Sequence, residues 1–267
     1  MGHGSPTPAD KIDIHARTRL LIGDAGMARL AAARVAVIGL GGVGSAAAEQ
    51  LCRAGVGRLT LVDFDAVRES NLNRQLFALR STLGRPKAEV AAERLADIDP
   101  DCVVDAQVAF FAADTAADLD LAGQDYVLDC IDSLNPKAQL IHHCVKNGVP
   151  VITSTGAAAK TDPSGVAVRD LFETRNCPLA RHLRRRLRNL GVTGGVPAVH
   201  SPAVPQKAKG REPEEDLLRR GRPRIPLGSI SYVPVLFGCL MAGHVVQHLL
   251  GSTPSGTDRN GRPEAGW

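Results

Sequence analysis

Arg34-Val-Ala-Val-Ile-Gly-Leu-Gly-Gly-Val-Gly44 begins as a run of apolar residues and ends in a group of glycines. The apolar part has the length and composition of a buried parallel strand. The glycines fit the spacing G-x-G-x-x-G, and a helix is expected to follow over 45–53. Bare backbone can approach phosphates closely, and the amino end of a helix favours negative charge. This stretch therefore predicts a nucleotide-binding loop formed by Gly39, Gly41, Gly42 and Gly44.

An acidic residue closes the next expected strand. Arg58-Leu-Thr-Leu-Val-Asp63 ends about 20 residues after the glycines, where a carboxylate can accept hydrogen bonds from ribose hydroxyls. The loop and Asp63 together predict nucleotide binding.

Strands and helices alternate beyond this unit, which is typical of a Rossmann-like, doubly wound, mostly parallel α/β sheet. We expect helices over 86–98 and 136–147, and strands over 103–109, 126–129 and 151–154. Later elements are expected as a strand over 165–170, an Arg-rich helix over 178–190, a last strand over 228–233 and a final helix after Pro234. The later strands would extend the sheet in antiparallel fashion.

The length of 267 residues suits a single domain. We divide it into an N-terminal arm (11–33), a nucleotide-binding core (34–160), a C-terminal part expected to bind the substrate (161–250) and a disordered tail (251–267). The Pro/Gly-rich, charged stretch over 191–226 is expected to be mobile.

Composition narrows the class of protein. Hydrophobic residues make up 44% and charged residues 22%, as in ordinary globular proteins. The six cysteines form no CxxC pair, which argues against structural zinc, and no secretory signal is recognisable, so a cytoplasmic protein is expected. Residues 230–250 are largely apolar but include prolines, glycines and histidines, so we expect a buried core helix and no membrane contact.

Charged residues behind the glycine loop favour ATP over NAD. A triphosphate attacked at its α-phosphorus needs cations and a magnesium ligand. Arg74 and Lys87 can supply the cations, and Asp132, in Asp129-Cys-Ile-Asp132-Ser133, can supply the carboxylate. NAD-dependent oxidoreduction is the less favoured alternative, because it needs no such set.

The segment from Arg34 to Thr155 resembles the adenylating domain of the ubiquitin-activating, ThiF, MoeB and HesA superfamily. Its matching motifs are the glycine loop, Leu61-Val-Asp-Phe-Asp65, Ser70-Asn-Leu-Asn-Arg-Gln75, Gly84-Arg-Pro-Lys87 and Asp129-Cys-Ile-Asp132. The resemblance implies that the protein joins AMP to a carboxylate, with ATP and Mg²⁺ as cofactors.

The same resemblance implies roles for individual residues. Asp63 would hold the ribose with Asp65 nearby, Asn73, Arg74 and Lys87 would contact phosphates, and Asp132 would bind magnesium. Gln75 and Ser133 are added to the nucleotide-binding set. Members of the superfamily are usually homodimers in which an arginine of the N-terminal arm enters the neighbouring site, and Arg19 matches that arginine best.

Residues 17–250 resemble most closely the branch of tRNA threonylcarbamoyladenosine dehydratases. Its supporting segments include Asp132-Ser-Leu-Asn-Pro-Lys137-Ala and Gly228-Ser-Ile-Ser-Tyr-Val-Pro234. The implied reaction adenylates the threonyl carboxylate and closes a ring, so no catalytic cysteine is needed. Cys177 is accordingly interpreted as a packing residue. The alternative is an adenylyltransferase for a sulfur-carrier or ubiquitin-like protein, and a sulfur-relay or carrier protein is kept as a possible partner.

A tRNA substrate requires a cationic surface. On the Arg-rich helix, leucines fall on one side and arginines on the other, which predicts phosphate contacts from Arg181, Arg184, Arg185 and Arg188.

Overall fold

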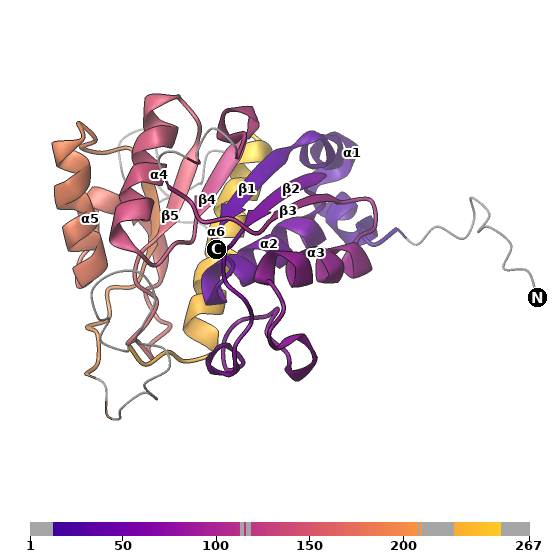
Figure 1. The fold of residues 1–267 in the computed structure, drawn as a ribbon. Coiled ribbons are helices and arrows are strands. Elements are labelled where there is room, and N and C mark those ends of the chain that lie inside the picture. The colour runs from indigo at the N-terminus through magenta and orange to yellow at the C-terminus, as the bar shows by residue number, and fades with distance from the viewer. Residues whose placement is uncertain (1–12, 113–114, 116–118, 208, 210–226, 252–267) are drawn as a thin grey trace, which may run out of the picture.

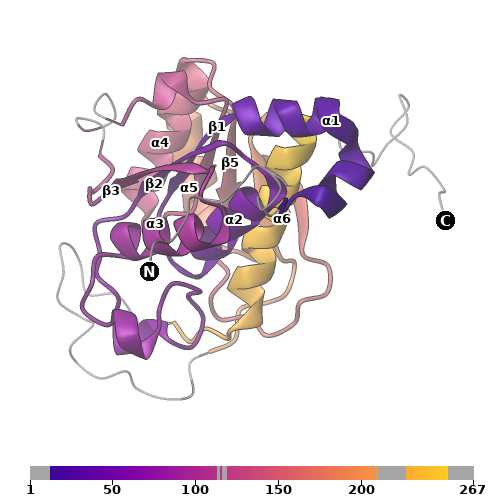
Figure 2. The same ribbon diagram turned by 90° about the vertical axis from the view of Figure 1, so that its right-hand side faces the viewer.

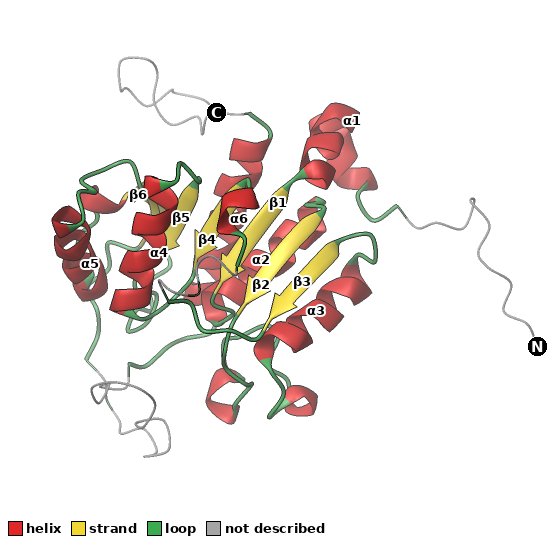
Figure 3. Ribbon diagram, turned by 45° about the horizontal axis from the view of Figure 1, so that its top comes forward, coloured by secondary structure: helices red, strands yellow, loops and turns green. Residues whose placement is uncertain are grey.

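Seven strands form one sheet in the part of the chain that the computed structural model describes, residues 13–112, 115, 119–207, 209 and 227–251. The strands are β1 (Arg34–Ile38), β2 (Arg58–Val62), β3 (Val103–Gln107), β4 (Tyr126–Asp129), β5 (Val151–Ser154), β6 (Ala167–Asp170) and β7 (Pro197–His200). Their order is β3-β2-β1-β4-β5-β7-β6, and all neighbours are parallel except β6 and β7 (Figures 1 and 3). The expected fold class is confirmed, and the strand order changes direction between β1 and β4, where such sheets bind ligands.

Helices cover both faces of the sheet (Figures 1 and 2). They are α1 (Ala16–Ala32), α2 (Gly42–Ala54), α3 (Lys87–Ile98), α4 (Leu134–Lys146), α5 (Pro178–Asn189) and α6 (Tyr232–Leu249). Side chains of α2, α3 and α6 share one apolar core with alternate residues of β1 and β2. Those of α4 and α5 form separate cores on the other face. Strands buried on both faces explain the continuous apolar runs in the sequence.

The C-terminal part differs from the expectation in two places. The stretch expected to be mobile contains β7, whose Ala198 and Val199 are fully buried between β5 and β6. The strand expected over 228–233 is wrong, because helix α6 already begins at Tyr232. Pro234 fits the first turn of that helix, where its missing N–H has no intrahelical partner to lose. Residues 210–226 and the tail over 252–267 lie outside the described residues.

Helix α6 packs into the core alongside α2. It has the length and the mean hydropathy, 1.3, of a membrane span, as does no other helix in the described ranges. Its residues Val233, Phe237, Met241 and Val245 are nevertheless fully buried. At Gly238 a Cβ would lie 2.4 Å from the backbone oxygen of Val43, so the two helices are in backbone contact.

Helix α1 lies at the amino ends of the strands. It is broken at Gly23, whose φ of 69° is a left-handed conformation that suits glycine. Directly after the break, Asp24 accepts a hydrogen bond from Arg19. Before the break, Leu20 and Leu21 are 89% and 86% exposed, so this half of α1 presents apolar side chains to its surroundings.

Candidate nucleotide-binding and adenylation site

The glycine loop joins β1 to α2 in a turn that few side chains would permit. A Cβ on Gly44 would lie 1.8 Å from the Gly39 oxygen, and one on Gly42 would lie 2.8 Å from Pro234. Gly39 has a φ of 95° and faces the backbone of Cys130. At Gly41, by contrast, the nearest atom to a Cβ would be 3.9 Å away, on Gln75. Three glycines therefore serve close packing, while Gly41 leaves room for a phosphate.

Asp63 follows β2 and fixes the two loops beside it. Its Oδ2 accepts the N–H of Leu40 at 2.6 Å, and its Oδ1 accepts the N–H of Asp65 at 2.8 Å. Burial raises the pKa of Asp63, against the opposing effect of Lys87. The carboxylate thus holds the glycine loop in place at the end of β2 where a ribose is expected.

Lys87 occupies the first turn of α3, close to Asp65. Its Nζ lies 3.5 Å from Asp65 Oδ2, and its backbone N–H donates to the Asp65 oxygen at 3.0 Å. The Lys87 side chain is only 8% exposed. At 3.5 Å this ion pair is loose, so the ammonium group has hydrogen-bonding capacity left for an anion.

The motif over 70–75 lies across the glycine loop. The backbone oxygen of Arg74 would be 3.3 Å from a Cβ on Gly42. The Arg74 guanidinium donates to Ser70 O and Asn73 Oδ1, and Asn73 donates to Ser229 O at 3.0 Å. Asn73, Arg74 and Gln75 are therefore assembled with the loop, Asp63 and Lys87 at the carboxyl edge of the sheet.

Asp132 lies in the loop between β4 and α4, close to the point between β1 and β4 where the strand order changes direction. It is exposed, and Ser133 Oγ donates to its Oδ1 at 3.3 Å. Within the described ranges no group of three or more His, Cys, Asp or Glu side chains could hold a metal ion. Mg²⁺ bound to nucleotides commonly takes one or two carboxylates and completes its shell with phosphate oxygens and water. A single exposed carboxylate at this edge of the sheet fits that kind of site.

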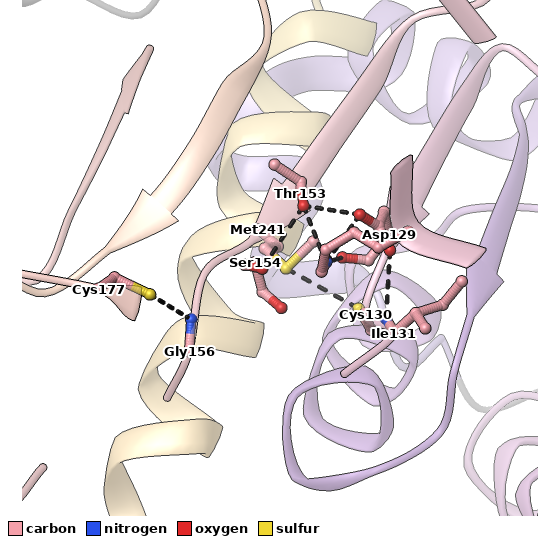
Figure 4. A network of polar contacts seen from close by, with 9 residues as sticks. Asp129, Cys130, Ile131, Thr153, Ser154, Gly156, Cys177 and Met241 are labelled. Atoms are coloured by element: carbon pink, nitrogen blue, oxygen red, sulfur yellow. Dashed lines mark hydrogen bonds and ion pairs between the residues drawn. The ribbon is translucent and has the colours of Figure 1, made fainter. Parts of the chain in front are cut away.

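A buried ion pair next to the loop between β4 and α4 was not predicted from the sequence. Asp129 at the end of β4 and Lys137 in α4 are both fully buried, with Lys137 Nζ 2.7 Å from Asp129 Oδ2. Thr153 of β5 joins them, and Figure 4 shows Asp129 and Thr153 side by side. The available signal was an aspartate at a strand end followed eight residues later by a lysine in an otherwise apolar helix face.

Cys177 is buried at the start of α5. Its Sγ accepts the N–H of Ala180 at 3.4 Å as a helix cap and the N–H of Gly156 at 3.3 Å (Figure 4). The thiol therefore packs and caps, which agrees with its interpretation as a packing residue.

The four arginines expected to bind RNA have different surroundings. Arg184 is half-buried and donates to Thr174 Oγ1 at 2.6 Å and to the Leu171 oxygen. Arg188 lies 5.2 Å from the centre of the Phe172 ring. Arg181 and Arg185 are exposed. The leucine side packs as expected, since Leu183 and Leu187 are buried.

Arg19 is far from the rest of the predicted site within its own chain. It lines a pocket of about 810 Å³ together with Arg34, Arg58 and Val103, which begin β1, β2 and β3. That pocket is at the amino edge of the sheet, opposite the glycine loop. Arg19 pairs there with Asp13 and Asp24.

Comparison with known proteins gives one consistent match. The tRNA threonylcarbamoyladenosine dehydratase of Bacillus subtilis is 41% identical over 237 residues, which is 88% of this chain and 93% of the relative. Crystal structures of the Escherichia coli dehydratase TcdA, in complex with AMP and with ATP, are 37% identical and superpose with TM-scores of 0.80 and 0.78, each covering 88% of this chain and 93% of the other. The molybdopterin-synthase adenylyltransferase of Salmonella typhimurium is 43% identical, but over only 51% of this chain and 54% of its own length.

The family model described as "ThiF family" matches residues 15–262, which include helix α1, every strand of the sheet and helix α6. With that match, and with a glycine loop, Asp63, Lys87 and Asp132 placed around one edge of the sheet, this chain belongs to the ThiF family.

Proposed function

We propose that this protein is an ATP-dependent tRNA threonylcarbamoyladenosine dehydratase. The observation that carries the proposal is the extent of the similarity: 41% identity to a relative of that name covers 88% of the chain, so it includes β6, α5 and β7 as well as the nucleotide-binding half. The similarity to a carrier-protein adenylyltransferase covers 51%. The two TcdA complexes, with AMP and with ATP, support ATP as the cosubstrate.

The geometry gives each residue at the carboxyl edge a task. Backbone N–H groups of the glycine loop and the amino end of α2 would bind phosphate, and Asp63 would hold the loop and meet the ribose. Lys87 and Arg74 would neutralise the triphosphate. Asp132 would hold Mg²⁺, which supplies charge neutralisation between the phosphates when bound.

The chemistry proceeds in two steps. The threonyl carboxylate attacks the α-phosphorus of ATP, and pyrophosphate leaves. The neighbouring ureido group then attacks the acyl carbonyl, a proton leaves the ureido group, and AMP departs. The substrate has lost one water, and ATP has become AMP and pyrophosphate. The second step is intramolecular, so proximity accelerates it and a thioester through the buried Cys177 is unnecessary.

The partners follow from the same proposal. The substrate would be tRNA in the cytoplasm, with exposed arginines of α5 meeting its phosphates. A homodimer would bring Arg19 of one subunit to the site of the other, which suits its position at the amino edge of its own sheet. A sulfur-relay or carrier protein is a further possible partner.

The test incubates the purified protein with ATP and Mg²⁺ and measures AMP. Three substrates are compared: tRNA carrying threonylcarbamoyladenosine, tRNA lacking it, and candidate carrier proteins with free C-terminal carboxylates. AMP release with the first alone, and a product nucleoside lighter by one water, is expected. AMP formation driven only by a carrier protein would replace this function with the alternative.

A further inference from the structure

Lys137 is a buried cation whose hydrogen-bonding capacity is used up inside the protein. Its Nζ donates to Asp129 Oδ2 at 2.7 Å, to Thr153 Oγ1 at 2.9 Å and to the Asp129 backbone oxygen at 3.3 Å. An ammonium group has three N–H donors, so none is left for a phosphate. Lys87 differs from Lys137 in this respect, because its one ion pair is loose and leaves donors for a ligand.

The partners of Lys137 hold the segment that leads to Asp132. Asp129 Oδ1 accepts the N–H of Ile131 at 3.2 Å, which fixes the turn directly before Asp132. The N–H of Cys130 donates to the Ile38 oxygen at 2.9 Å, and the Cys130 oxygen would be 3.0 Å from a Cβ on Gly39. The turn is thus tied on one side to the ion pair and on the other to the glycine loop. Figure 4 shows the contact between Asp129 and Ile131 within this turn.

Three elements meet at this ion pair. Asp129 ends β4, Thr153 lies in β5, and Lys137 is in α4, the helix that begins two residues after Asp132. Thr153 Oγ1 also lies 2.7 Å from Asp129 Oδ2, so the carboxylate is held from two elements. A rigid connection of this kind can keep a neighbouring ligand group within the narrow geometry that Mg²⁺ requires.

We infer that Lys137 is a positioning residue for the metal–nucleotide site, acting through Asp129 and the 129–132 turn to set the carboxylate of Asp132 toward Mg²⁺ and the triphosphate. The inference rests on the proposed function for the role of Asp132. The inference gives the buried ion pair between Asp129 and Lys137 a role in the reaction. Stability alone does not explain such a pair, because a buried ion pair often adds little to the free energy of unfolding.

The variants are chosen so that no unpaired charge is left in the core. Asp129→Asn with Lys137→Met removes both charges, and the new amide side chain retains an oxygen that can accept the Ile131 N–H. Thr153→Val removes only the hydroxyl. Lys146→Met, at an exposed lysine of the same helix, is the matched control. Each variant is first checked by circular dichroism and thermal unfolding.

Two readouts separate metal positioning from folding and from catalysis. Calorimetry measures nucleotide affinity with Mg²⁺ and in excess EDTA, and Mn²⁺ binding to the protein–nucleotide complex is followed by electron paramagnetic resonance. We expect the double variant to bind ATP in EDTA within about 2-fold of the parent but to bind the metal in the complex about 10-fold more weakly. Lys146→Met should match the parent in both.

A double-mutant cycle that combines the core changes with Asp132→Asn tests whether Lys137 acts through Asp132. If Lys137 acts through Asp132, adding the core changes to Asp132→Asn should weaken metal binding no further. Equal losses with and without Asp132, or a variant that melts earlier but binds the metal normally, would overturn the inference. These binding measurements need no tRNA, so failure of the proposed function would show separately, as absence of AMP release by the parent protein.

Discussion

Asp129 and Asp132 are three residues apart, yet their carboxylates have opposite surroundings. Asp129 is fully buried, and desolvation raises its pKa against the effect of Lys137. Asp132 is exposed near the end of the loop between β4 and α4. A buried, paired carboxylate suits a structural task, whereas an exposed one at the carboxyl edge of the sheet suits the metal ion of the proposed function.

Asp132→Asn should therefore lower the rate of AMP formation by about 100-fold or more while leaving the fold intact, because an amide cannot neutralise the metal's charge. Steady-state AMP release and the unfolding temperature check the two halves of this statement. A well-folded variant with the parent's rate would remove Asp132 from the reaction.

Cys177 should be replaceable by serine with activity retained, since a hydroxyl can accept the same N–H groups and no thioester is required. Cys177→Ala should lower the free energy of unfolding by about 1 kcal/mol through loss of the cap. Urea titration of both variants measures this. A folded but inactive serine variant that accumulates acyl-adenylate would favour acyl transfer through the thiol.

Some of these residues could be predicted from sequence and some could not. The glycines and Asp63 follow a spacing that strand, loop and helix geometry dictates, so their placement at one edge was foreseeable. Lys137 of α4 donates a hydrogen bond to Thr153, 16 residues away in β5, and this contact depends on how α4 packs on the sheet. Local patterns do not encode such a contact.

At the scale of elements, Glu49 joins α2 to α3. Its carboxylate lies 2.9 Å from Arg53 Nε in its own helix and 2.7 Å from Arg94 Nε in the next. Burial acts to raise its pKa, but the hydrogen bonds from Arg94 and Arg53 outweigh burial and hold the pKa below its ordinary value of 4.5. Because the pKa of Glu49 is lower in the folded than in the unfolded protein, its carboxylate stabilises the fold fully at pH values above the unfolded pKa.

Glu49→Gln should consequently lower the free energy of unfolding by about 1 kcal/mol at pH 7, since both arginines are partly exposed and screened. The difference should shrink as the pH falls from about 4.5 through the lower folded pKa, where the parent loses the same charge. Denaturant titrations of both proteins over pH 3–7 measure it. A difference that does not change with pH would mean that packing, and not charge, is lost.

Helix α5 divides its arginines between structure and surface. Replacing Arg181 and Arg185 by Ala should weaken tRNA binding and lower the salt slope by about one for each phosphate that the protein no longer neutralises. Arg184→Ala should instead lower the free energy of unfolding by about 1 kcal/mol or more, because Thr174 and Leu171 lose a donor. Filter binding at several salt concentrations measures the RNA effect, and urea titration measures the effect on stability. Arg58→Ala, at the start of β2, is the control. An unchanged slope would move the RNA site off α5.

Most elements follow from apolar runs bounded by glycine and proline, but β7 did not. Its four residues lie in a Pro/Gly-rich stretch that reads locally as loop. They form a strand because β5 and β6 offer backbone partners on both sides, with Thr153 and Ser154 paired to Ala198 and Val199. Tertiary context overrides local propensity here.

At the scale of the whole molecule, the position of Arg19 makes the proposed dimer testable. Arg19→Ala and Asp132→Asn should each inactivate the enzyme, yet mixed subunits should recover about a quarter of the parent activity. Half of the dimers are then mixed, and one of their two sites is intact. AMP release after subunit exchange, verified by mass spectrometry of the mixed dimer, measures the recovery. Exchange without recovery would show that the arm does not complete a neighbouring site.

The contact between α2 and α6 has a consequence for the protein without nucleotide. Gly42 and Pro234 bring the first turns of the two helices together at the same edge of the sheet. Each amino end carries roughly half a positive charge, so the two ends repel one another when nothing anionic is present. A triphosphate bound beside the two helix ends would offset this repulsion, because its negative charge attracts both amino ends. Without nucleotide, the repulsion between the two helix ends lowers the stability of the fold. ATP binding should therefore raise the free energy of unfolding, in addition to supplying the reaction.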